Sequence, residues 1–166
     1  MRAQSRIGTI TWLGHHFLSA AQLTRALGLK PSDAYSKEAL DAKLNYWPDN
    51  SDFTSRYMNQ GYLFFALSPV AKTQADGTTD LLFTLHEGPT AQVDTITVKS
   101  NRKIATADIL RMLPLHQGEL FSRAKLIQSQ RVLTKSGFFD PTKIAVNPQP
   151  DPARGLVNVG FVVVEK

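Results

Sequence analysis

Two short segments of the chain alternate apolar and polar residues with a period of two. They cover residues 7–13 and 93–99, and such alternation is typical of a β-strand with one buried face. Each is followed by two segments with apolar residues at helical spacing and then by two further alternating runs. The pattern therefore predicts strand, helix, helix, strand, strand in each half, with the last two strands forming a hairpin.

The two halves are copies of one pattern. The residues that fall into register after a shift of 86 positions include Ile7 with Val93, Trp12 with Val98 and Leu23 with Ile109. The first copy then carries about ten extra residues between Leu44 and Tyr57, after which the match resumes up to Glu87 and Glu165. Recurrence in this order indicates two tandem domains, which we expect at residues 1–90 and 91–166.

Capping residues mark where the predicted helices begin and end. Ser19 is expected to begin the first helix, with Gln22 completing a capping box and Gly28 ending the helix. Thr106 is the expected cap of the equivalent helix in the second copy. Serines at matching positions are expected to begin the second helix of each copy, namely Ser36 and Ser122.

Proline and glycine residues predict the breaks and turns. In the first copy Pro48 interrupts the second helical pattern, so we expect a break there. Asp76 and Gly77 supply the chemistry of a hairpin turn. In the second copy the proline-rich residues 147–152 are expected to form a stiffer loop at the equivalent place.

Composition and charge exclude several classes of protein. The chain has no cysteine, which rules out disulfides and thiolate metal sites, and no apolar run approaches the roughly 18 residues of a membrane-spanning helix. The first residues lack the apolar core of a signal peptide, and we expect the chain to be part of a longer polypeptide. The net charge of +5 arises in the second copy, because residues 93–166 carry 11 Lys and Arg against 6 Asp and Glu while residues 1–92 are neutral.

No arrangement of residues in the sequence indicates catalysis. His15 and His16 are adjacent in a predicted turn, and neighbouring side chains rarely converge on one metal ion. The sequence contains no Gly-x-Ser-x-Gly elbow and no glycine-rich phosphate loop. We therefore expect a non-enzymatic protein with no catalytic residue, no metal site and no cofactor.

Short motifs recur together with this order of elements. They are Gly14-His15 and Ser100-Asn101 after the first strands, residues 118–122 before the last helix and residues 133–140 after it. With these motifs the pattern resembles the POTRA (polypeptide-transport-associated) domain, and in detail the POTRA domains of the BamA family of outer-membrane β-barrel assembly proteins. The resemblance covers residues 7–166. Residues 57–65 are similar to the fourth POTRA domain of that family, and residues 157–166 to the end of the fifth, which precedes the membrane barrel. Ser100 departs from the family's usual glycine, so its turn must accommodate a side chain.

The resemblance implies an α+β fold of two tandem POTRA-like domains, each a three-stranded mixed sheet covered by two helices. It also implies a place on the periplasmic side of the outer membrane, beside the parent protein's own C-terminal barrel. The expected role is to bind unfolded outer-membrane β-barrel proteins and accessory lipoproteins for folding and insertion into the membrane. The alternatives are a POTRA pair of a related translocation barrel with other cargo, a scaffold that captures nothing, and a soluble basic nucleic-acid-binding module.

In this family the second strand of each sheet is an edge, and strand addition there is the proposed mode of capture. An uncovered edge presents unpaired backbone N–H and C=O groups, and backbone hydrogen bonds provide affinity with little sequence selectivity. The two strands are expected at residues 63–70 and 139–146. Alternation should turn one of Phe64 and Phe65 outward; we expect it to be Phe65, although both could fill the core. The candidate peptide-binding residues are Leu63, Phe65, Leu67, Lys143 and Ala145.

The basic excess has its own competing interpretations. Lys125, Arg131 and Lys135 are candidates for a face toward the barrel or toward anionic lipid headgroups. A plain solvated helix face is the simpler alternative. We expect no nucleic-acid partner, because no binding motif occurs and the aromatic residues occupy core-like periodic positions instead of lying between basic residues.

Overall fold

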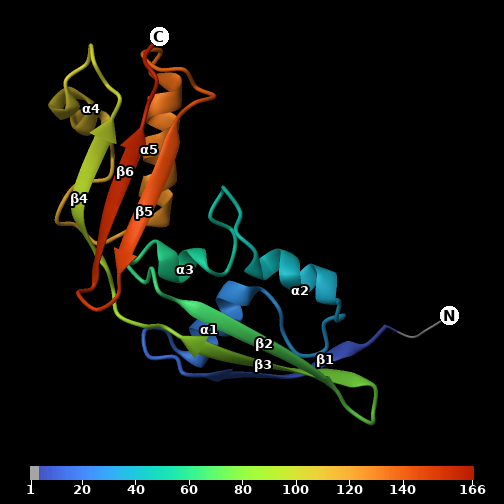
Figure 1. Ribbon diagram of the computed structural model, residues 1–166. Coiled ribbons are helices and arrows are strands. Elements are labelled where there is room, and N and C mark those ends of the chain that lie inside the picture. The colour runs from blue at the N-terminus through green and yellow to red at the C-terminus, as the bar shows by residue number, and fades with distance from the viewer. Residues whose placement is uncertain (1–3) are drawn as a thin grey trace. The chain divides into compact units, whose positions relative to one another are not determined.

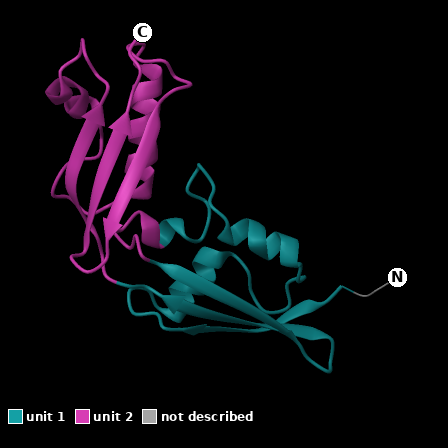
Figure 2. Ribbon diagram, in the orientation of Figure 1, with its two compact units in different colours: residues 1–56, 65–88 teal, residues 57–64, 89–166 magenta. Residues whose placement is uncertain are grey.

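The computed structural model describes residues 4–166, which form two three-stranded sheets with their helices (Figure 1). The chain divides into two compact units (Figure 2). Unit 1 contains the residues up to Arg56 together with Phe65–Gly88, and unit 2 contains Tyr57–Phe64 together with Pro89–Lys166. The domain limits at residues 90 and 91 stay a prediction, and residues 1–3 of the first predicted domain lie outside the described residues.

Unit 1 is built on a mixed sheet with the strand order β1-β3-β2. The central strand β3 runs parallel to β1 and antiparallel to β2. The elements of this copy are β1 (Arg6–Leu13), α1 (Ala20–Leu27), α2 (Lys37–Leu44), α3 (Ser55–Met58), β2 (Ala66–Thr73) and β3 (Thr78–His86). The strand β2 is therefore an edge of its sheet.

Unit 2 repeats this arrangement with the strand order β4-β6-β5. Its elements are β4 (Gln92–Lys99), α4 (Thr106–Met112), α5 (Arg123–Lys135), β5 (Ala145–Asp151) and β6 (Leu156–Val162). Even the irregularities recur, since the parallel pairing shifts register between Ile7 and Ile10 and again between Val93 and Ile96. The predicted repeat and the predicted α+β class are confirmed.

Most of the predicted helix caps are confirmed. Ser19 forms a reciprocal capping box with Gln22, and α1 ends at Gly28 in the left-handed conformation with φ 73°. Ser36 and Ser122 each accept a backbone N–H at the start of α2 and α5. The prediction for Thr106 is wrong by one residue: Ala105 is the cap of α4 and makes no side-chain hydrogen bond.

The extra residues of the first copy break the second helix, as Pro48 predicts, and return an aromatic side chain to the core. Helix α2 stops at Leu44 and α3 starts only at Ser55. Phe53, within this insertion, is 1% exposed and stacks on Trp12 with a ring-centroid distance of 5.4 Å. Trp12 also stacks on Phe83 of β3 at 4.3 Å, and its indole N–H donates to the Thr24 hydroxyl.

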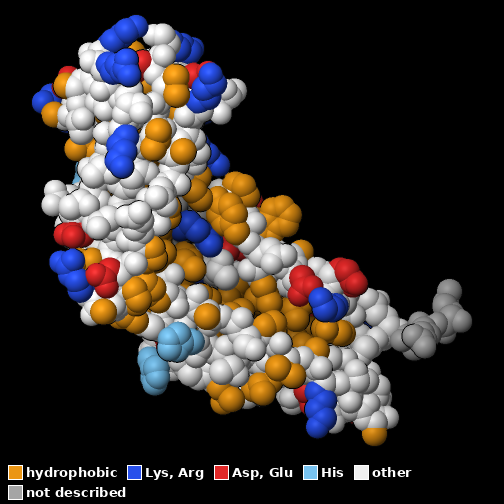
Figure 3. Space-filling view, viewed as in Figure 1, with side chains coloured by type: hydrophobic (Ala, Val, Ile, Leu, Met, Phe, Trp, Pro, Cys, Tyr) orange, Lys and Arg blue, Asp and Glu red, His pale blue; other side chains and the backbone are white. Residues whose placement is uncertain are grey.

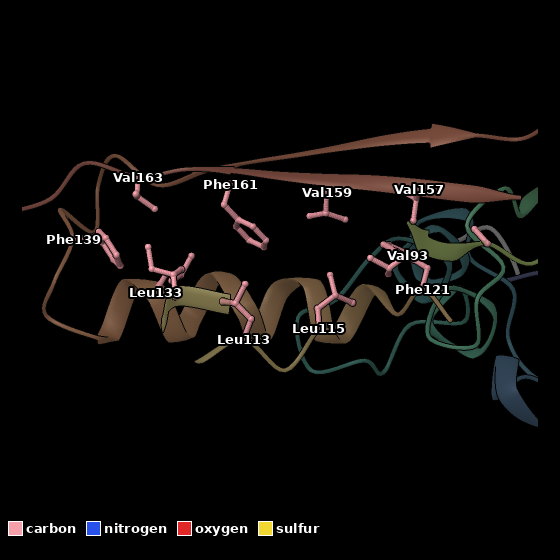
Figure 4. Close-up of a cluster of buried hydrophobic side chains, with 12 residues drawn as sticks. Val93, Leu113, Leu115, Phe121, Leu133, Phe139, Val157, Val159, Phe161 and Val163 are labelled. Atoms are coloured by element: carbon pink, nitrogen blue, oxygen red, sulfur yellow. The ribbon is translucent and has the colours of Figure 1, made fainter. Parts of the chain in front are cut away.

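The core of unit 2 lies between β6 and the helices, as Figure 4 shows. Val157, Val159 and Phe161 point from β6 toward the helical layer, where they meet Leu133 of α5 and Leu113, which follows α4. These residues are at most 1% exposed. Alternate residues of β6 are therefore buried, as expected of a strand with one face on the core.

A segment of the first sequence copy belongs to unit 2. The backbone N–H of Ala91 donates to the carbonyl of Gly61 at 2.7 Å, and the Asn59 side chain accepts the N–H of Ala124 at 2.9 Å. Leu63 and Phe64 pack against the buried cluster of this unit. Residues 57–64 therefore take part in the second core.

The edge strands start later than the sequence predicts. Strand β2 begins at Ala66 instead of residue 63, because the preceding residues 57–64 pack in unit 2. Strand β5 begins at Ala145 instead of residue 139, because Phe139 is fully buried in the core and residues 140–143 form a turn. The expectation of a loop at residues 147–152 is also wrong, since Asp151 and the four residues before it belong to β5.

Candidate functional site

The strand β2 is an exposed edge over most of its length. From Ser68 to Thr73 every residue is exposed, and only Leu67 is half-buried. Leu67, Pro69 and Ala71 lie opposite Leu85, Phe83 and Leu81, the residues of β3 that are buried. A chain added beside β2 would thus place alternate side chains next to an apolar strip.

The hairpin turn holds β2 in register with β3. Gly77 has φ 87°, and its N–H donates to the carbonyl of Gln74 at 3.0 Å. The Asp76 carboxylate accepts from both the hydroxyl and the backbone N–H of Thr78. These two hydrogen bonds, the hydroxyl first, hold the pKa of Asp76 below its ordinary value. The predicted Asp-Gly turn is confirmed.

The backbone groups of β2 that face outward can be assigned from the register. Gln74 N–H donates to Thr78 carbonyl at 2.7 Å, so the backbone of Gln74 faces β3. Along an antiparallel edge strand the backbone N–H and C=O groups of successive residues point alternately toward the neighbouring strand and away from it. The backbone groups of the odd-numbered residues of β2 therefore point away from β3. Among these odd-numbered residues, Leu67, Ala71 and Thr73 each have an N–H group that points away from β3, whereas Pro69 has none.

The edge of β5 is different. Val163 N–H donates to the carbonyl of Lys99 at 3.2 Å, toward β4, so the even-numbered residues of β6 bond to β5. Pro148 and Pro150, which lie opposite Val159 and Val157, therefore face outward. Since proline has no N–H, Val146 is the one outward-facing residue of β5 with a donor.

The structure separates the predicted edge residues. Leu67 lies on the outward-facing edge of β2, whereas the side chain of Phe65 is 7% exposed, so its expected exposure is wrong. Leu63 precedes the strand and packs in the core of unit 2. Both residues precede the strand, which starts only at Ala66.

The two predicted edge residues of the second copy do not face outward from a strand. Lys143 lies in the turn before β5, where its N–H donates to the carbonyl of Asp140 and its Nζ is 3.7 Å from the Asp140 carboxylate. The backbone of Ala145 pairs with Val162 and faces β6. The outward-pointing residues Ala71 and Thr73 of β2 were not predicted from the sequence. For β5, the prolines at 148 and 150 were a sign in the sequence of an edge strand with one protected side, because proline cannot donate to another strand.

The predicted basic face is not continuous. Lys125 pairs with Glu119 at 2.9 Å. Burial opposes ionisation of Glu119, but hydrogen bonds from Lys125 and from the His116 N–H outweigh it and lower its pKa. Lys125 and Arg131 are six residues apart, about 120° around the helix, whereas Arg131 and Lys135 are one turn apart and border the same groove.

Within the described part of the chain, no group of three or more His, Asp or Glu side chains is placed to hold a metal ion. None of the helices among residues 4–166 has the length and apolar character needed to cross a membrane.

Comparison with known proteins identifies the same architecture elsewhere. The POTRA family model, described as surface antigen variable number repeat, matches residues 5–88 and 91–166. A protein of Treponema pallidum (strain Nichols) named as an outer membrane protein assembly factor is 22% identical over 94% of this chain. The chain spans only 19% of that relative's length.

Two solved structures share the fold. A fragment of Haemophilus influenzae BamA with POTRA domains 3–5 superposes with a TM-score of 0.73 and 17% identity, over 97% of this chain and 66% of that one. Haemophilus ducreyi BamA lacking POTRA domains 1–3 superposes with a TM-score of 0.74 and 15% identity, over 99% of this chain and 30% of that one. At these identities the similarity establishes the fold.

Proposed function

Because the chain belongs to the POTRA family, we propose that it is the periplasmic POTRA segment of an outer-membrane β-barrel assembly protein. In this proposal the pair precedes the parent's membrane barrel and takes no part in catalysis. It receives unfolded outer-membrane proteins before they fold and insert into the membrane. It also provides a docking site for accessory lipoproteins. The name of the Treponema pallidum relative supports this assignment, and the sequence resemblance of residues 157–166 supports the place next to the barrel.

The observation that carries the proposal is the difference between the two edges. In β2 three of the four outward-facing residues, Leu67, Ala71 and Thr73, retain an N–H. In β5 prolines remove two of the three donors, at positions 148 and 150. Proline on an edge strand blocks pairing with another chain, so capture by strand addition belongs to β2 and not to β5.

This edge suits a protein that handles many clients. Backbone groups are common to all polypeptides, so an extended segment of almost any sequence can add to β2. The neighbouring strip of Leu67, Pro69 and Ala71 favours segments with alternating apolar residues, which is the pattern of a strand destined for a membrane barrel. The proposed client class follows from these two properties together.

The test exchanges the prolines between the two edges. Ala71 and Thr73 lie opposite Leu81 and Thr79, and Pro148 and Pro150 lie at the matching places opposite Val159 and Val157. The double variant Ala71→Pro/Thr73→Pro should lose binding of a synthetic peptide with a barrel-strand pattern, because two outward donors disappear without touching the bonds to β3. The reciprocal variant Pro148→Ala/Pro150→Thr should gain binding at β5.

Two controls separate pairing from other effects. The same peptide with an N-methyl group on every residue has no N–H donor on either edge and should not bind. Val70→Ala removes an exposed side chain of β2 while keeping every N–H, and should bind almost normally. Unchanged peptide crosslinking to a folded Ala71→Pro/Thr73→Pro variant would contradict capture at β2.

A further inference from the structure

A groove in unit 2 lies between the end of α4 and the last turns of α5. It is open to solvent and has a volume of about 650 Å³. Its apolar lining comes from Met112, Val132 and Phe138, and its cationic lining from Arg131 and Lys135. Among the described residues that line it there is no carboxylate. It belongs to a different unit from β2 and plays no part in the proposed strand capture.

Phe138 is the exposed apolar residue of the groove, and hydrogen bonds hold its backbone. Phe138 is 52% exposed, although the neighbouring Phe139 is fully buried in the core. The N–H of Phe138 donates to the Ser136 hydroxyl, and its carbonyl accepts from Lys166 N–H at 3.1 Å. Because the backbone is already ordered, a partner that covers this aromatic side chain has to restrict only its two side-chain torsions.

The two charged residues that line the groove are both cationic. Arg131 and Lys135 follow each other by one helical turn and are exposed. On the face of unit 2 seen in Figure 3, Lys and Arg side chains outnumber Asp and Glu side chains near the C-terminal end. The nearby acidic residues already have partners: Asp108 pairs with Arg111 and Asp140 with Lys143. Glu165 accepts four backbone hydrogen bonds from residues 102–104.

We propose that this groove is a docking site for an acidic amphipathic protein segment. An apolar side chain of the segment would cover Phe138 and Val132, and carboxylates one helical turn apart would meet Arg131 and Lys135. Charge complementarity selects an acidic partner. The concave apolar floor selects a segment with an apolar anchor over a headgroup that offers charge alone.

The test measures binding of a synthetic peptide with leucines at helical spacing flanked by glutamates to the 166-residue chain. Adding the peptide should shift the NMR signals of the Phe138 and Ser136 amide groups. Binding should weaken as the salt concentration is raised. Arg131→Gln and Lys135→Gln should each reduce the affinity for the peptide about two- to fivefold, as expected for exposed ion pairs. Phe138→Ala should weaken it further while the unit stays folded, because this side chain is not part of the core.

Matched controls decide the outcome. Arg154→Gln removes a cation in the turn between β5 and β6, away from the groove, and should leave binding unchanged. A peptide with glutamine in place of glutamate should bind more weakly; equal binding of the two peptides would overturn the proposal. It would also be overturned if phosphatidylglycerol vesicles, and not the acidic peptide, bound in a way that needs Arg131 and Lys135.

Discussion

Both carboxylate oxygens of Glu165 accept a hydrogen bond from the backbone N–H of Lys103, each at 2.9 Å. The N–H groups of Arg102 and Ile104 add bonds of 2.9 and 3.0 Å. Unit 1 repeats the arrangement, with Glu87 accepting from the N–H groups of His16 and Phe17. In each sheet one glutamate therefore ties the residues after the central strand to the loop that follows the first strand.

This contact predicts a pH dependence of unit 2. Burial opposes ionisation of Glu165, but the N–H groups of Ile104, Lys103 and Arg102 outweigh it and hold its pKa below the ordinary value of a glutamate. A lowered folded-state pKa contributes stability that is complete above the unfolded value, about 4.3, and is lost as the pH falls through the folded value.

Glu165→Gln should therefore destabilise unit 2 at neutral pH and reduce the loss of stability between about pH 5 and about pH 3. Hydrogen exchange of the Ile104 and Val163 amides, followed in the variant and the parent between neutral pH and about pH 3, measures this difference in stability. Glu119 and Asp140 also have lowered pKa values and remain in both proteins, so the readout is the difference between variant and parent. Identical pH profiles would contradict the assigned role of Glu165.

Equivalent turns of the two copies predict opposite effects of glycine and serine. Ser100 adopts φ 70° and Gly14 adopts φ 80°. Ser100→Gly should stabilise unit 2 by about 0.5–1 kcal/mol, because the left-handed conformation is strained for residues with a Cβ. Gly14→Ser should destabilise unit 1 by more than about 2 kcal/mol, since a Cβ there would lie 2.2 Å from the Leu85 carbonyl oxygen.

Different probes suit these two variants. Both tryptophans, Trp12 and Trp47, belong to unit 1, so urea unfolding followed by tryptophan fluorescence reports the Gly14→Ser variant. The Ser100→Gly variant requires amide exchange in unit 2. Destabilisation by Ser100→Gly would show that the serine side chain makes a favourable contact that outweighs the backbone strain.

The inserted loop of the first copy predicts unequal costs for two aromatic substitutions. Phe53→Ala should destabilise unit 1 by about 3–5 kcal/mol, because it leaves a cavity beside Trp12. Trp47→Ala in the same loop should cost less than about 1 kcal/mol, because Trp47 is 47% exposed. Trp12 remains in both variants as the fluorescent probe of urea unfolding, and similar costs would show that the loop is not anchored through Phe53.

Local chemistry made part of this protein predictable from its sequence. Ser19, Ser36 and Ser122 begin their helices where expected because a cap depends on the few backbone N–H groups that follow it. The Asp76-Gly77 turn depends in the same way on neighbouring residues. The repeat was visible because both copies bury the same alternate positions of the central strand, as in Phe83 and Phe161.

The candidate site was less predictable, because exposure depends on what packs nearby. Phe65 and Leu63 follow a strand-like pattern, yet one is buried and the other packs in the core of unit 2. Lys125 looks like a free cation until Glu119 is found beside it. No pattern within the segments themselves could reveal these partners.

Two copies of one α+β fold, most of their helix caps and their shared family could be predicted from the order of the residues alone. Long-range packing sets where the edge strands begin, which side of each edge is open, and that residues 57–64 pack in unit 2. Caps, turns and strand periodicity depend on contacts between residues close in the chain. By contrast, which edge of β5 Pro148 and Pro150 point to depends on the register between β5 and β6. That register is fixed by pairing and packing across the whole sheet, and the local sequence does not specify it.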